Sequence, residues 1–116
     1  MKYERFEDLP VWRAAINLAI ETYALTGRPL FSGHFSLRDQ IQRAAVSISN
    51  NIAEGFERGT TPELLTFLYI ARGSAGEVRS MLCLLERLPP FAGLKSENFK
   101  FENSRGRHLA TIARLG

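Results

Sequence analysis

The chain has 116 residues, of which 45% are hydrophobic and 23% are charged, proportions typical of one globular domain rather than of a disordered chain. Its formal net charge is +3, its single cysteine excludes a disulfide within the chain, and no apolar run reaches the roughly 18 residues of a membrane-spanning helix. The charged start, MKYERFEDLP, lacks the apolar segment of a secretory signal, so no membrane contact and a cytoplasmic location are expected.

The positive charge is concentrated near the C-terminus. Residues 1–94 carry ten Lys or Arg and ten Asp or Glu, whereas residues 95–116 carry five basic and two acidic side chains. A basic segment favours an anionic partner such as a nucleic acid. Solvated basic faces are also common in proteins without such a partner, so the charge alone does not decide between these two readings.

The spacing of apolar residues predicts helices and no strands. The first helix is expected over residues 9–25, with Asp8 as N-cap and Pro10 in the first turn, where a missing N–H costs nothing. Residues 26–36 contain two glycines and a proline and predict a loop. The second helix is expected over residues 37–58, after Ser36 as N-cap.

The third helix is expected to begin with Thr61 as N-cap and to end near Leu88, where two prolines follow. A fourth helix is expected over residues 96–115, weakened by Gly106. Four helices joined by short connections predict an all-α fold, an antiparallel up-down-up-down four-helix bundle that forms a single domain over residues 1–116.

The second predicted helix has an apolar side and an opposite polar side. The apolar side is Leu37, Ile41, Ala44, Ala45, Ile48, Ile52 and Gly55. The polar side, called the polar ribbon below, is Gln40, Arg43, Ser47, Asn50, Asn51, Glu54 and Arg58. A solvent-exposed helix usually carries Lys and Glu, whereas this ribbon has no lysine and three short side chains. Short polar side chains suit a surface that another molecule contacts, and an ordinary exposed face is the alternative.

The third predicted helix also has two distinct sides. Its apolar stripe is Leu64, Phe67, Leu68, Ala71, Ala75, Val78, Leu82 and Leu85. The other side, the small-residue face, is Thr66, Gly73, Gly76 and Ser80, with Tyr69 and Glu77 beside it. Each glycine costs a helix roughly 1 kcal/mol relative to alanine, which is tolerable where another backbone approaches closely. The candidate interface residues are therefore Ser47, Asn50, Asn51, Glu54, Gly73, Gly76, Glu77 and Ser80.

Three stretches carry a resemblance to a known family. FEDLPVW (6–12), QIQRAAVSISNNIAEGFER (40–58) and FLYIARGSAGEVRSML (67–82) resemble the four-helix-bundle proteins encoded in intervening sequences of bacterial 23S rRNA genes, a family sometimes labelled ribosomal-protein-like. The family's polar positions fall here on Arg43, Ser47, Asn51, Glu54, Gly55, Arg58, Arg72, Gly73, Ser74 and Glu77. One departure is Gln42 beside Arg43, where relatives often have two adjacent arginines.

The resemblance implies a four-helix bundle that assembles with copies of itself, since relatives form homopentamers with a central channel. The accessory protein of diversity-generating retroelements looks like the same architecture and binds nucleic acid and a reverse transcriptase. We therefore expect a non-enzymatic homopentameric ring that binds RNA or DNA with low specificity. The candidate phosphate contacts are Arg43, Arg58, Arg72, Lys100, Arg105 and Arg107. The alternative is an adaptor for an unidentified protein encoded nearby, without nucleic-acid binding.

Enzymatic chemistry is not expected. Neither His34 nor His108 lies three residues after a glutamate, as a di-metal site in a helical bundle requires, so no metal and no cofactor are predicted. The spacing from Arg28 to His34 matches that of some small helical ribonucleases, but a proline and a glycine place it in a loop. Glu54 and Glu77 are expected to form a salt-bridged cluster rather than an acid–base pair, so no catalytic residue is assigned.

Overall fold

The computed structural model describes residues 3–92, and in that part of the chain all regular structure is helical. The elements are η1 (Phe6–Asp8), α1 (Pro10–Thr26), η2 (Pro29–Phe31), α2 (Phe35–Glu57), α3 (Thr61–Arg87) and η3 (Pro89–Phe91), the η elements being short 3₁₀ helices. The all-α prediction is confirmed. The described residues contain three α-helices rather than four, because the fourth predicted helix, at 96–115, lies outside them.

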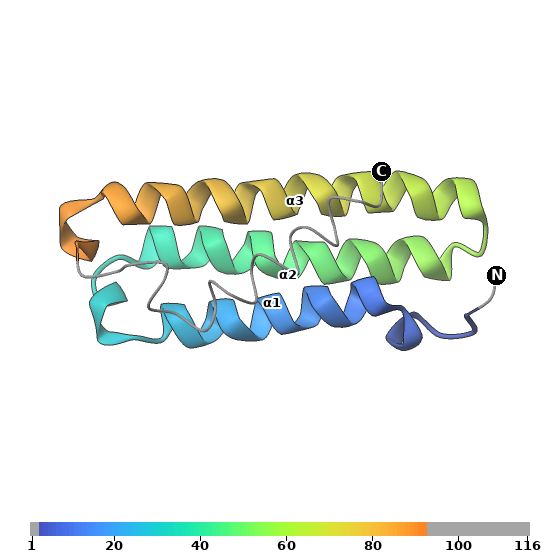
Figure 1. Cartoon of the computed structure of the whole chain (residues 1–116), viewed down its shortest axis with the longest axis horizontal. Helices are drawn as coiled ribbons and strands as arrows, with labels where there is room; N and C mark the ends of the chain where they lie inside the picture. The colour runs from blue at the N-terminus through green and yellow to red at the C-terminus, as the bar shows by residue number, and fades with distance from the viewer. Residues whose placement is uncertain (1–2, 93–116) are drawn as a thin grey trace.

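The three α-helices run antiparallel in succession, with α2 between α1 and α3 (Figure 1). The connection from α2 to α3 turns at Gly59, whose φ of +88° lies in the left-handed region that favours glycine after a helix end. α1 and α3 run in the same direction because each is antiparallel to α2, and they form the two edges of the arrangement (Figure 1).

The start of α3 has a capping box, one residue before the predicted position. Thr60 is the N-cap: its Oγ1 accepts a hydrogen bond from the backbone N–H of Glu63 at 3.3 Å, and its hydroxyl donates to the Glu63 carboxylate at 2.8 Å. The prediction of Thr61 as N-cap is therefore wrong by one residue, because both threonines precede the proline and only the structure separates them.

The other two predicted caps are wrong. Asp8 is the last residue of η1, so Leu9 is the N-cap of α1, and it caps without a side-chain hydrogen bond. His34 precedes α2, which begins at Phe35, so Ser36 lies inside the first turn instead of before it. In both places an adjoining turn of backbone, which the sequence pattern does not reveal, sets the first helical residue.

The core lies along the apolar side of α2, as predicted. Ile41, Ile48 and Ile52 are fully buried there, and the apolar stripe of α3 is buried from Leu68 to Leu85. Gly55 allows α2 and α3 to approach each other, because a Cβ added to it would lie 2.5 Å from the Cβ of Phe67. The packing of α3 on α2 therefore requires glycine at this position.

Two phenylalanines from connecting segments complete the core at one end of the helices. Phe31 of η2 and Phe91 of η3 are 1% and 0% exposed, and their ring centroids lie 4.9 Å apart. The ring of His34 packs against Phe91 with the centroids 5.0 Å apart. Sequence analysis missed both phenylalanines as core residues, because they lie outside any helical period.

Candidate interaction surface on α2 and α3

The residues of the polar ribbon of α2 lie in different environments, some half-buried against α3 and others exposed. Ser47 and Asn51 are half-buried and lie toward α3. The hydroxyl oxygens of Ser47 and Ser74 are 2.9 Å apart, and the Asn51 amide donates to the backbone carbonyl and the hydroxyl of Ser47 at 2.8 and 3.0 Å. Ser74 is only 6% exposed. Of the predicted interface residues, Ser47 thus joins α2 to α3 within the chain, and Asn51 supports it with two hydrogen bonds inside α2.

Arg58 is held at the end of α2. Its guanidinium donates to the Glu54 carboxylate at 2.8 Å, lies 3.9 Å from Glu63, and stands over the ring of Phe67 at 5.1 Å from the centroid. The hydrogen bond to Glu54 is the main cause that raises the pKa of Arg58. Because its charge is already balanced, Arg58 is a weaker candidate for a phosphate contact than the sequence indicates.

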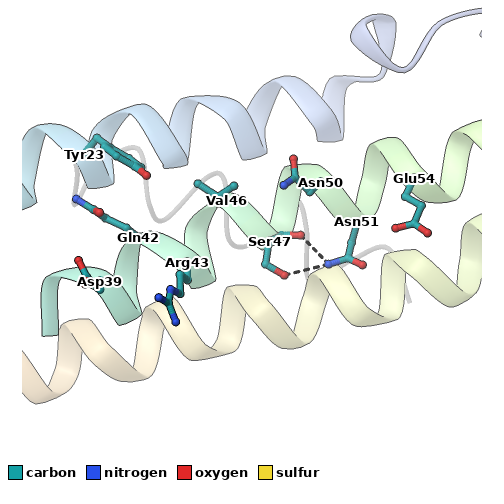
Figure 2. Close-up of a pocket in the computed structure, with 9 residues that line it drawn as sticks. All are labelled: Tyr23, Asp39, Gln42, Arg43, Val46, Ser47, Asn50, Asn51 and Glu54. Carbon is teal, nitrogen blue, oxygen red and sulfur yellow. Dashed lines mark hydrogen bonds between the residues drawn. The ribbon is translucent and has the colours of Figure 1, made fainter. Parts of the chain in front are cut away.

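Most of the ribbon lines an open groove of about 620 Å³ along the outer side of α2 (Figure 2). Tyr23 of α1 borders the groove, and the lining residues of α2 are Asp39, Gln42, Arg43, Val46, Ser47, Asn50, Asn51 and Glu54. Arg43 and Asn50 are exposed. Within residues 3–92 Arg43 makes no ion pair, so its guanidinium is available to a partner.

Gln42, which borders this groove, has a structural role. Its amide donates to the hydroxyl of Thr26 at 2.9 Å, which links α2 to the end of α1. Thr26 is 2% exposed, and its own hydroxyl donates to the carbonyl of Thr22 at 2.9 Å. Gln42 therefore holds two helices together.

The small-residue face of α3 points away from α2. Gly73, Gly76 and Ser80 are exposed, and a Cβ added to either glycine would meet no atom within 4 Å. Among the described residues, large hydrophobic side chains accompany them on exposed parts of α3: Leu65, Tyr69, Ile70 and Leu84, which are 43–55% exposed. Unlike at Gly55, no close contact among the described residues requires glycine at these two positions.

The predicted phosphate contacts separate into three groups. Arg43 and Arg72 are exposed, and neither makes an ion pair within residues 3–92. Arg58 is paired. The other three, Lys100, Arg105 and Arg107, lie outside the described residues. Residues 3–92 carry nine basic and ten acidic side chains, a net charge of −1, so the basic excess does not belong to this part.

The expected cluster of acidic and basic residues forms only in part. Glu54 pairs with Arg58, whereas Glu77 makes no ion pair within the described part of the chain. Glu77 instead borders a second, smaller pocket together with Arg43 and Met81. Over residues 3–92 no three His, Cys, Asp or Glu side chains are grouped closely enough to hold a metal ion.

None of the helices in residues 3–92 combines the length and the apolar character that crossing a membrane requires.

Comparison with protein families gives one match, to the model of the 23S rRNA-intervening sequence protein, over residues 7–104. Neither the curated proteins nor the solved structures that were compared give a match. The matched range includes all three α-helices and, apart from Phe6, the three stretches that carry the resemblance. The chain belongs to the 23S rRNA-intervening sequence protein family.

Proposed function

We propose that the chain is a non-enzymatic, cytoplasmic helical bundle that assembles with copies of itself into a homopentameric ring. The observation that carries this proposal is the outer face of α3, where Gly73 and Gly76 are exposed among large hydrophobic side chains. Two glycines cost a helix about 2 kcal/mol relative to alanine, and no packing among the described residues offsets that cost. Glycine at these positions lets the backbone of a neighbouring subunit approach α3 closely, and that packing offsets the cost.

The ring binds RNA or DNA with low sequence specificity. Five chains of +3 carry about +15 in one assembly, which attracts phosphates and makes the affinity fall steeply with salt. Because residues 3–92 have a net charge of −1, the binding depends mainly on Lys100, Arg105 and Arg107, with Arg43 and Arg72 as additional contacts.

Two measurements test this function. Light scattering after size-exclusion chromatography should give about 65 kDa, five times the 13.1 kDa of one chain. Titration of a labelled single-stranded RNA should show binding at about 50 mM salt that is largely lost at about 200 mM. The variant Arg105→Glu, Arg107→Glu should weaken this binding about tenfold or more. Unchanged affinity at low salt would contradict the nucleic-acid part of the proposal.

A matched control separates a local contact from a general loss of positive charge. Arg13 lies on α1 with its side chain 63% exposed, and it neighbours the acidic Asp8 at 3.7 Å. The variant Arg13→Glu changes the charge of each chain by the same amount as Arg105→Glu alone. We expect Arg13→Glu to reduce the RNA affinity less than Arg105→Glu does. The charge at position 13 adds to the electrostatic field of the whole assembly but does not contact phosphate.

The net charge of −1 over residues 3–92 favours a second function, an adaptor for another protein. In that case the ring presents the α2 groove to a polypeptide and does not bind nucleic acid. Purification from the native cell distinguishes the two functions. Nucleic acid that is removed by high salt supports the first, and a stoichiometric co-purifying protein without nucleic acid supports the adaptor.

A further inference from the structure

We draw no further inference here: the strongest candidate, the groove on α2 around Arg43, belongs to the interaction surface already described, and nothing in the structure shows what fills it.

Discussion

A Cβ atom on Gly55 would lie 2.5 Å from the Cβ of Phe67, so α2 and α3 cross at a point that only glycine accommodates. Gly73 and Gly76, on the outer face of α3, have no such neighbour. The same residue type therefore serves two purposes in one chain, and substitution by alanine separates them.

We expect Gly55→Ala to lower the free energy of unfolding by about 1–2 kcal/mol. The clash with Phe67 forces the two backbones apart, and this exceeds the gain of about 1 kcal/mol that alanine gives a helix. Urea denaturation measures the difference. Gly73→Ala is the control and should not destabilise the isolated chain. Equal or greater stability for Gly55→Ala would show that the helices do not pack as closely as described.

The hydrogen bond between Ser47 and Ser74 should contribute measurably to the packing of α2 on α3. A double-mutant cycle with Ser47→Ala and Ser74→Ala is expected to give a coupling energy of about 0.5–1.5 kcal/mol, because Ser74 is buried and the two hydroxyls are 2.9 Å apart. Additive single effects would mean that the two serines act independently.

The capping box at the start of α3 predicts a difference between two adjacent threonines. Thr60→Ala should cost about 1 kcal/mol of stability, because it removes the acceptor for the Glu63 N–H and the partner of the Glu63 carboxylate. Thr61→Ala, at the next and exposed position, should change stability by less than about 0.5 kcal/mol. Thermal unfolding of both variants provides the comparison, and the reverse order would restore Thr61 as the cap.

The buried pair Phe31 and Phe91 should contribute strongly to stability, because the two rings fill one end of the core. Phe91→Ala is expected to cost about 3–5 kcal/mol, since it empties a fully buried site against Phe31 and His34. Phe91→Leu, which refills most of the volume, should cost clearly less. Similar losses for the two variants would indicate a role other than filling this space.

Periodicity is sufficient to predict the three α-helices and the buried sides of α2 and α3. Ile41, Ile48 and Ile52 lie one turn or two apart, and their burial follows directly from that spacing. Phe31 and Phe91 could not be predicted in this way, because they lie in segments that turn after a single 3₁₀ helix. Their burial depends on how two connections, 60 residues apart in sequence, meet in space.

The candidate surface was predicted in outline but not in detail. The short side chains of the ribbon indicate a contacted surface, and for Ser47 the described contact is with Ser74 on α3 of the same chain, whereas Asn51 bonds to Ser47 within α2. A helical pattern gives the direction of a side chain and not the identity of its neighbour. The glycines of α3 were predicted to lie on an outer face, and the open space above them agrees with that prediction.

The most direct test of self-association through α3 is sedimentation equilibrium of the wild type and of Gly76→Gln. The wild type should give a multiple of 13.1 kDa, about 65 kDa for five copies. Gly76→Gln should dissociate at concentrations where the wild type is intact, while its isolated chain becomes more stable because glutamine favours helix. A wild type of 13.1 kDa at every concentration, or a variant with unchanged mass and affinity, would contradict the account.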